Sequence, residues 1–304
     1  MKTLVTGSSG LIGSALVPYL RRNGQHVVRL LRDAATEPDT FRWAPMDGVL
    51  PDGVFDGVHA VIHLAGANIA ERRWTKRRRA LLRNSRVVGT RLLAETLASL
   101  EKKPSVLISA SGIGYYGDGG DQPLGETNEA GQGFLPELAR EWETALSPAK
   151  TAGIRTVAIR LGMVLSAHGG ALAEMLPLFE RGLGARLGNG RQYMSWISLS
   201  DVLPAIFYIL STDKLRGPVN LVSPNPVTNA EFTHTLANVL GKPARLIVPG
   251  FALRLLLGRM AGELLLASQR AVPGKLIAAR FPFAWPKLDE ALAHVLEKRA
   301  RLSQ

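Results

Sequence analysis

Residues 4–13 read Leu-Val-Thr-Gly-Ser-Ser-Gly-Leu-Ile-Gly, and this stretch decides the fold. A β-prone run, a glycine-rich turn and a helical pattern follow one another, which predicts the strand, turn and helix of a dinucleotide site. Glycines there permit positive φ angles, a close backbone approach to a pyrophosphate and tight helix packing. An ordinary strand-to-helix turn is the alternative. The residues predicted to bind the cofactor here are Gly7, Ser8, Ser9, Gly10, Leu11, Ile12 and Gly13.

The end of the second predicted strand favours one cofactor. An NAD-preferring site carries an acidic residue at this place, which bonds the ribose 2′-hydroxyl. This chain has Arg32 instead, and a guanidinium matches the charge and shape of a 2′-phosphate. We therefore expect NADP rather than NAD. The alternative is that Arg32 is a solvated loop residue and the neighbouring Asp33 binds the ribose.

Short β-prone runs alternate with helical patterns, which is typical of βαβ units and a parallel sheet. The expected strands are residues 3–5, 27–31, 60–64, 105–109, 156–161 and 219–222, and the expected helices are residues 11–23, 76–100, 135–152 and 202–211. From about residue 226 the pattern is mainly helical, with Thr228 or Asn229 as the cap of a helix over 230–240. We therefore predict an α/β fold. Residues 1–225 form a doubly wound parallel sheet of Rossmann type, and residues 226–304 form a smaller, mainly helical substrate lobe.

Composition excludes several kinds of chemistry. The chain has 304 residues, 46% of them hydrophobic, and no cysteine, so disulfides, cysteine-bound metals and thiol nucleophiles are excluded. The six histidines do not have metal-ligand spacing, and we predict no metal site. We find no signal peptide and no uncharged run of ~20 apolar residues, which predicts a cytoplasmic protein outside the membrane.

The chain is strongly basic, with 37 Lys and Arg residues against 25 Asp and Glu residues and a formal charge of +12. Eight basic residues lie between Arg72 and Arg86, a density that nucleic-acid-binding proteins also have. No nucleic-acid motif accompanies this run, and Trp74 is its one aromatic residue, so a solvated helix face is the better interpretation. The charge instead favours an anionic small-molecule substrate.

Further motifs carry a family resemblance. They are His63-Leu64-Ala65-Gly66-Ala67, Arg72-Arg73-Trp74, Ser85-Arg86, the run from Ser109 to Gly117, Arg160 to Leu165, Gly188 to Ile197, and Ala267 to Arg270 with Pro273. With the glycine turn, they make the chain resemble the extended short-chain dehydrogenase/reductases, in particular an atypical epimerase-like family with a C-terminal segment of unassigned function. The resemblance implies an NAD(P)-binding Rossmann core and a relative of nucleotide-sugar epimerases and dehydratases. It places four residues at and just after the end of the third expected strand at the cofactor, namely Leu64, Ala65, Gly66 and Asn68.

The chain departs from this superfamily at the usual catalytic device, a tyrosine followed four residues later by a lysine that lowers the phenol pKa. No Tyr-x-x-x-Lys occurs, and the corresponding positions hold Leu135 and Ala139. Ser111 and Tyr116 follow the strand 105–109, at the edge where open α/β sheets bind ligands, and are the predicted catalytic residues. The alternatives are that the Tyr116 ring packs under the loop and that Ser111 satisfies backbone groups.

Two carboxylates on the expected helix 135–152 are further candidates for acid or base. Glu141 and Glu143 could serve if they faced the ligand crevice. Surface carboxylates are the more ordinary interpretation of both.

Two loops are predicted to contact the substrate. Arg73 and Trp74 follow the strand 60–64, where cations could clamp phosphates through charge-assisted hydrogen bonds. Gln192 and Trp196 lie in a turn-rich loop with aromatic rings, which suits sugar or ring contacts. A purely structural role of this second loop is the alternative.

Two functions of different class follow from these observations. The first is an NADP-dependent epimerase, dehydratase or reductase that acts on a phosphorylated or nucleotide-linked, sugar-like small molecule. The second is a regulatory protein that senses the cofactor and has little or no turnover, because the fold alone does not decide activity. A homodimer is compatible with either function.

Overall fold

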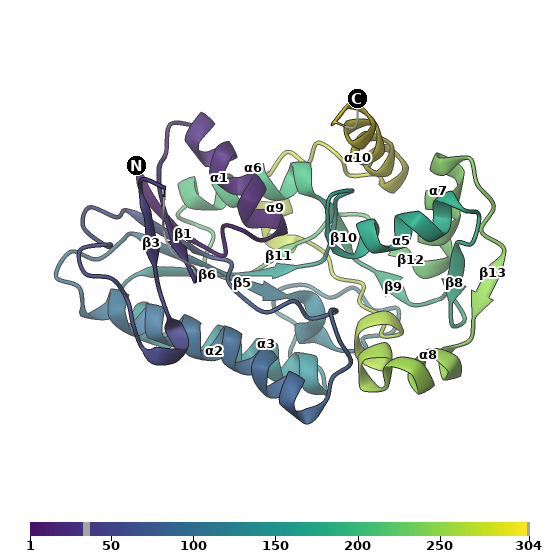
Figure 1. The fold of residues 1–304 in the computed structure, drawn as a ribbon, viewed down its shortest axis with the longest axis horizontal. Coiled ribbons are helices and arrows are strands. Elements are labelled where there is room, and N and C mark those ends of the chain that lie inside the picture. The colour runs from purple at the N-terminus through teal and green to yellow at the C-terminus, as the bar shows by residue number, and fades with distance from the viewer. Residues whose placement is uncertain (33–36, 303–304) are drawn as a thin grey trace. The chain divides into compact units, whose positions relative to one another are not determined.

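The computed structural model describes residues 1–32 and 37–302, and its main feature is a seven-stranded sheet (Figure 1). The strand order is β11-β6-β5-β4-β1-β2-β3. The strands are β1 (Lys2–Thr6), β2 (His26–Leu31), β3 (Thr40–Arg42), β4 (Ala60–His63), β5 (Val106–Gly112), β6 (Arg155–Leu161) and β11 (Gly217–Leu221). β1 pairs in parallel with β2 and β4, β2 with β3, and β4 with β5. The predicted doubly wound parallel sheet is confirmed, and β3 is a strand that the sequence pattern did not indicate.

Helices cover both faces of this sheet (Figure 1). α1 (Leu11–Arg22) and α6 (Leu199–Ser211) share one face, where the rings of Tyr19 and Phe207 meet edge to face with 6.2 Å between centroids. α2 (Lys76–Ser99) and α3 (Phe134–Thr144) share the other, where Nε1 of Trp142 donates to Oγ1 of Thr90. The single helix expected over 135–152 is wrong. Pro148 cannot continue an α-helix, and it lies instead in the first turn of α4 (Ser147–Thr151).

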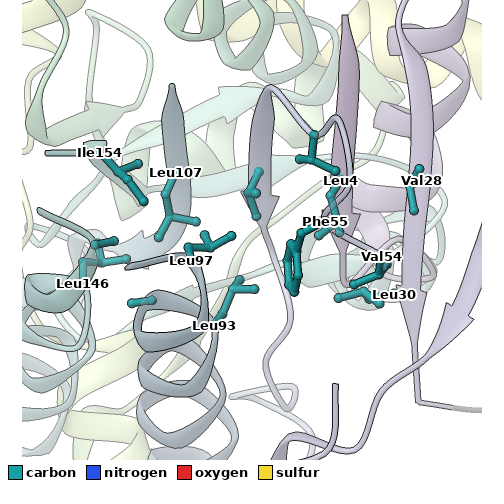
Figure 2. Close-up of a cluster of buried hydrophobic side chains, with 14 of the residues drawn as sticks. Leu4, Val28, Leu30, Val54, Phe55, Leu93, Leu97, Leu107, Leu146 and Ile154 are labelled. Carbon is teal, nitrogen blue, oxygen red and sulfur yellow. The ribbon is translucent and has the colours of Figure 1, made fainter. Parts of the chain in front are cut away.

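The core between α2 and the sheet consists mainly of aliphatic side chains from successive βα units, with the aromatic rings of Trp43 and Phe55 among them (Figure 2). Leu4 of β1, Leu107 of β5, and Leu93 and Leu97 of α2 are fully buried there. Burying one such side chain stabilises the fold by about 1.5–3 kcal/mol. Because helices cover both faces, these strands are nearly continuous hydrophobic runs in the sequence, which is why the pattern predicts them.

The chain divides into two compact units, each made of several segments. The first unit comprises Met1–Ser111, Leu138–Ile159 and Ala205–Val219, and the second comprises Gly112–Glu137, Arg160–Pro204 and Asn220–Gln304. The domain boundary between residues 225 and 226 stays a prediction.

The second unit has its own hydrophobic core, in which Trp196, Phe232 and Leu292 are fully buried. Thr228 begins α7 with a capping box, because its hydroxyl accepts from the N–H of Glu231, whose carboxylate accepts from the N–H of Thr228. This confirms one of the two predicted caps. The elements of this unit include β7 (Met163–Leu165), α5 (Gly170–Glu180), β8 (Ala185–Leu187), β9 (Tyr193–Met194), β10 (Trp196–Ser198), β12 (Val227–Thr228), α7 (Asn229–Leu240), β13 (Leu246–Val248), α8 (Gly250–Leu257), α9 (Gly274–Ala278) and α10 (Leu288–Leu302).

The most apolar segment of the C-terminal part is interrupted. α8 ends before Gly258, whose φ is 62°, and a π-helical turn follows at Ala261–Leu265. Among the helices within residues 1–32 and 37–302, none is long and apolar enough to cross a membrane.

Candidate functional site

Two glycines determine the shape of the turn between β1 and α1. Gly7 has a φ of 67°, and a Cβ atom there would lie 2.6 Å from the backbone nitrogen of Ala65. A Cβ atom at Gly13 would lie 2.2 Å from the carbonyl oxygen of Gly7. Neither distance leaves room for a side chain, so the turn packs directly against α1 and the end of β4. At Gly10, by contrast, the one atom near such a Cβ is 3.4 Å away, and the protein leaves that side of the turn open.

The N-terminus of α1 suits an anion. Gly10 is the N-cap residue, it makes no side-chain capping hydrogen bond, and the first helical turn carries no acidic residue. The first N–H groups of an α-helix have no partner within the helix, and the helix dipole adds partial positive charge there. The turn and helix start therefore fit a phosphate, the group that a dinucleotide places at this position in a doubly wound sheet.

Arg29 is a cation beside this turn that the sequence analysis did not identify. It lies on β2 in register with Val5, and its Nε donates to Oγ of Ser8 at 3.1 Å. Its Nη1 pairs with the carboxylate of Glu37 at 2.8 Å. A charged residue within a buried, apolar strand is unusual. The position of Arg29 within such a run was therefore the feature of the sequence that could have indicated a role at this site.

Arg32 follows β2 and is exposed. Within the described ranges its side chain has no ion pair or hydrogen bond. Asp33, the alternative ribose ligand, lies outside the described residues. Two guanidinium groups therefore come from β2 and the residue after it, and Arg29 is the one whose position the protein fixes.

Helix α2 holds the loop after β4. Oγ of Ser85 accepts a hydrogen bond from the N–H of Ala67 at 3.2 Å, and Arg86 donates to the Ala67 carbonyl oxygen at 2.9 Å. Burial, with a smaller effect of Arg78, lowers the pKa of Arg86 to about 10, so the guanidinium stays charged at neutral pH. These contacts fix the backbone at Ala67 and give the Ser85-Arg86 motif a physical role.

The basic loop that follows is braced by its own residues. Trp74 is buried and donates its Nε1 to the carbonyl oxygen of Ile69 at 2.9 Å. Asn68 is exposed, and its side-chain oxygen accepts from the N–H of Ala70 at 3.0 Å. Arg73 is exposed, with no ion pair of its side chain in the described part of the chain. Trp74 thus shapes the loop that carries Arg73, and substrate binding by these two residues stays a prediction.

His63 ends β4 at the same sheet edge and is uncharged. Burial lowers its pKa to about 4. Its Nδ1 lies 2.7 Å from Oγ1 of Thr6, its partner in the β1–β4 register, and its ring meets Trp43 edge to face. Among the residues described, no three potential ligands of the His, Cys, Asp or Glu type gather into a metal site. His63 is therefore a neutral member of the strand pair.

Ser111 and Glu143 form a hydrogen-bonded pair in the first unit. Ser111 lies at the end of β5 with 4% of its surface exposed, and its Oγ donates to Oε1 of Glu143 at 2.8 Å. Glu143 is half-buried on α3. Glu141 pairs instead with Arg83 at 2.9 Å, in an ion pair whose two side chains are both more than 40% exposed. The two carboxylates, equivalent in the sequence analysis, thus have different surroundings.

The hydroxyl of Tyr116, in the second unit, has two partners. It donates to Oδ1 of Asn220 at 2.7 Å and accepts from Nη1 of Arg160 at 3.0 Å. Arg160 also lies over the ring of Tyr115, 3.4 Å from its centroid. Burial raises the pKa of the Tyr116 phenol, against the opposite effect of Arg160. Its catalytic role stays a prediction, and the phenol here joins a buried network.

The other two residues predicted to contact substrate bind backbone carbonyls. Nε2 of Gln192 donates to the carbonyl oxygens of Leu187 and Leu265 at 3.1 and 3.2 Å. Nε1 of Trp196 donates to that of Asn225 at 3.0 Å, and its ring is fully buried. Substrate binding by Gln192 and Trp196 stays a prediction. Their contacts in the structure hold the turn-rich loop in place.

A doubly wound sheet with a glycine turn after its first strand defines the Rossmann class of α/β proteins. The chain belongs to the NAD dependent epimerase/dehydratase family, whose model matches residues 3–221. A domain of unknown function, DUF1731, matches residues 248–295. The predicted epimerase-like family with an unassigned C-terminal segment is therefore confirmed.

Known relatives span almost the whole chain. An epimerase family protein of Mycobacterium leprae is 43% identical over 290 residues, which cover 95% of this chain and 94% of the relative. The crystal structure of human epimerase family protein SDR39U1 (isoform 2) with NADPH has a TM-score of 0.90 and 30% identity, covering 98% of this chain and 99% of that one. A nucleoside-diphosphate sugar epimerase from Corynebacterium glutamicum has a TM-score of 0.80 and 33% identity, covering 97% of this chain and 58% of that one.

Proposed function

We propose that this chain is an NADP(H)-dependent enzyme that acts on a phosphorylated or nucleotide-linked, sugar-like small molecule. The observation that carries the proposal is the contact between Arg29 and Ser8, which holds a guanidinium beside the glycine turn. An NAD-preferring site would have an acidic residue at the end of this strand. Arg32 adds a second positive charge directly after the strand. The human relative crystallised with NADPH supports the same cofactor.

The cofactor, when bound, supplies hydride transfer at its nicotinamide ring. In the proposal, the N–H groups at the start of α1 bind the pyrophosphate, and Arg29 and Arg32 bind the 2′-phosphate. The backbone at residues 64–67, which Ser85 and Arg86 hold at Ala67, borders the remaining half of the cofactor. Ser111 bonds the substrate oxygen whose proton moves during the reaction.

An anionic substrate is supported by two observations. The chain carries a formal charge of +12, and Arg72 and Arg73 are exposed in the loop after β4. Guanidinium groups bind phosphates through charge-assisted hydrogen bonds. The relative described as a nucleoside-diphosphate sugar epimerase supports a nucleotide-linked sugar as the first class to screen. A homodimer and a cytoplasmic location stay predictions.

Parallel fluorescence titrations with NADPH and NADH test the cofactor. We expect the wild type to bind NADPH at least about 10-fold more tightly, a preference of about 1.4 kcal/mol. Arg29→Ala and Arg32→Ala should each reduce this preference and leave NADH binding nearly unchanged. Arg22→Ala is the matched control, because it removes the same charge from the other end of the 12-residue helix α1. If neither nucleotide binds, the glycine turn has an architectural role alone and the proposal is wrong.

One observation favours a second function, a cofactor-sensing regulatory protein. Leu135 and Ala139 occupy the positions that the resemblance assigns to the tyrosine and lysine, and they are 8% and 5% exposed. A screen of nucleotide sugars and sugar phosphates separates the two functions. Conversion of one of them that Ser111→Ala abolishes supports the enzyme. NADPH-dependent association with a protein partner, without conversion, supports the sensor.

A further inference from the structure

We propose that Ser111 and Glu143 together transfer the proton of the reaction, in place of the Tyr-x-x-x-Lys pair that this chain lacks. The inference rests on the proposed function, because it assigns the acid and base of that same site. The group it acts on is the hydroxyl of a secondary alcohol or the oxygen of the corresponding carbonyl group of the substrate. Ser111 is the catalytic residue in this scheme, and Glu143 acts through it.

Strand register places Ser111 at the cofactor's edge of the sheet. Thr6, which precedes the glycine turn, is in register with His63 of β4, and His63 is in register with Ser109 of β5. Ser111 lies two residues beyond Ser109, so both side chains leave β5 on the same face.

The strand order specifies which half of the cofactor lies near Ser111. From β1 the chain adds β2 and β3 on one side of the sheet and then β4, β5 and β6 on the other. A dinucleotide binds across the switch point between β1 and β4 in such a sheet. The adenosine half belongs over β2, where the 2′-phosphate would meet Arg29. The nicotinamide half then belongs over β4 and β5, at whose carboxyl end Ser111 lies.

Helix geometry explains why Glu143 can take the place of the missing pair. Leu135, Ala139 and Glu143 are four residues apart on α3, so their side chains follow one another along a single helix face. The resemblance assigns the tyrosine and lysine to the first two positions, and Glu143 lies one turn further along that face. Its carboxylate reaches Oγ of Ser111 at 2.8 Å. Glu141 is about 200° around the helix from Glu143.

Ser111 donates its hydrogen bond to a carboxylate, and cations of α2 lie near the same helix α3. Arg83 of α2 pairs with Glu141, and Arg86 of α2 lies over the ring of Trp142, 5.1 Å from its centroid. On the β5 side, Ser109 is uncharged and donates to a backbone carbonyl. The hydroxyl of Ser111 therefore has an acceptor that can take a full proton, which a backbone carbonyl cannot.

This pair can move a proton in either direction. When the substrate alcohol is oxidised, Oγ of Ser111 receives the hydroxyl proton and passes its own proton to the Glu143 carboxylate. The electron pair and hydrogen of the substrate C–H bond leave as a hydride to the oxidised cofactor. The products are a carbonyl compound, the reduced cofactor and a protonated Glu143. Reduction runs the same steps backwards, with Glu143 as the source of the proton.

Nuclear magnetic resonance of bound NADP⁺ tests the pair without any substrate. The wild type, Glu143→Gln and Glu141→Gln are saturated with NADP⁺ carrying ¹³C at nicotinamide C4, and its chemical shift is followed from about pH 4 to about pH 9. Glutamine keeps an oxygen that accepts the Ser111 hydrogen bond but cannot take up its proton. We expect a titration step in the wild type and in Glu141→Gln, and its loss in Glu143→Gln with the NADP⁺ Kd unchanged.

The controls separate the inference from the proposed function. Failure of the wild type to bind NADP⁺ overturns the proposed function, and the inference with it. Binding without any titration step in the wild type, or with a step that persists in Glu143→Gln, overturns the inference alone. Ser111→Ala is the second variant, used also if Glu143→Gln does not fold. It keeps the carboxylate and should shift the midpoint of the step, and an unchanged midpoint contradicts the pair.

Discussion

The carboxylate of Glu263 accepts a hydrogen bond from the backbone N–H of Leu135 at 2.8 Å, so the C-terminal segment caps the start of α3. The N–H groups at a helix start have no partner within the helix, and a carboxylate there also meets the positive end of the helix dipole. The backbone at Gly133 also passes close to this carboxylate, since a Cβ atom added there would lie 3.0 Å from it. The segment of unknown function therefore stabilises the helix that carries Glu143.

Removing this cap should weaken the fold. We expect Glu263→Ala to lower the free energy of unfolding by about 1 kcal/mol, the usual effect of losing a helix cap. Urea denaturation at neutral pH measures it. Glu297→Ala, at an exposed position on α10, is the matched control and should change stability by less than about 0.5 kcal/mol. Equal losses in the two variants would show that the cap has no specific effect.

Gly13 and Gly10 should respond differently to the same added methyl group. Gly13→Ala places a Cβ where a carbonyl oxygen lies at 2.2 Å, so we expect a loss of about 1–3 kcal/mol and weaker NADPH binding. Gly10 has a φ of −80°, which alanine adopts readily. Gly10→Ala should therefore keep its stability and lose NADPH affinity. Thermal denaturation and nucleotide titration distinguish the two effects, and a strongly destabilised Gly10→Ala would contradict this account of the turn.

The buried His63 should make stability depend on pH. Its pKa falls from 6.5 in an unfolded chain to about 4 in the fold. Between these two pH values the imidazole is therefore protonated in the unfolded state and neutral in the folded state. The free energy of unfolding does not depend on His63 titration above about pH 6.5, and it falls by about 3 kcal/mol as the pH drops to 4. Urea denaturation at about pH 7 and pH 4.5 measures this loss. His63→Gln should lose less stability than the wild type between these pH values. The exposed control His234→Gln should lose as much as the wild type.

The hydroxyl of Tyr116 should contribute to stability. Tyr116→Phe leaves Asn220 and Arg160 without one buried partner, and we expect a loss of about 1–3 kcal/mol. Tyr115→Phe is the matched control, because it keeps the ring beneath Arg160. Unfolding curves of both variants measure the difference. An unchanged stability of Tyr116→Phe, with loss of substrate conversion, would instead support the predicted catalytic role of this phenol.

Local patterns explain why much of this fold could be predicted. The glycine turn at residues 7–13, the apolar parallel strands and the Thr228 cap each depend on neighbours in the sequence, where spacing alone carries the information. The break before α4 was also visible at Pro148, but the helical pattern on both sides outweighed it in the sequence analysis. Strand β3 is three residues long, too short to give a periodic signal.

Contacts between distant residues explain what the sequence analysis did not find. The place of Arg29 beside Ser8 depends on the register of β1 with β2, which no local pattern specifies. Ser111 and Glu143 are 32 residues apart, and their contact depends on how α3 lies on the sheet. Helix spacing puts Glu141 and Glu143 on different faces of α3, but it does not specify which of the two faces Ser111.

The close packing around Gly7 and Gly13 also has a consequence for the thermodynamics of ligand binding. Since the protein itself fixes this backbone, its conformational entropy is lost during folding and not when a nucleotide arrives. Under the proposed function, this turn is a preorganised cradle for the pyrophosphate, and the free energy of each N–H contact goes into affinity instead of loop ordering. A rigid cradle also accepts oxidised and reduced forms of a dinucleotide alike, because their pyrophosphates are identical. Discrimination between the two redox states must therefore come from the nicotinamide end of the site.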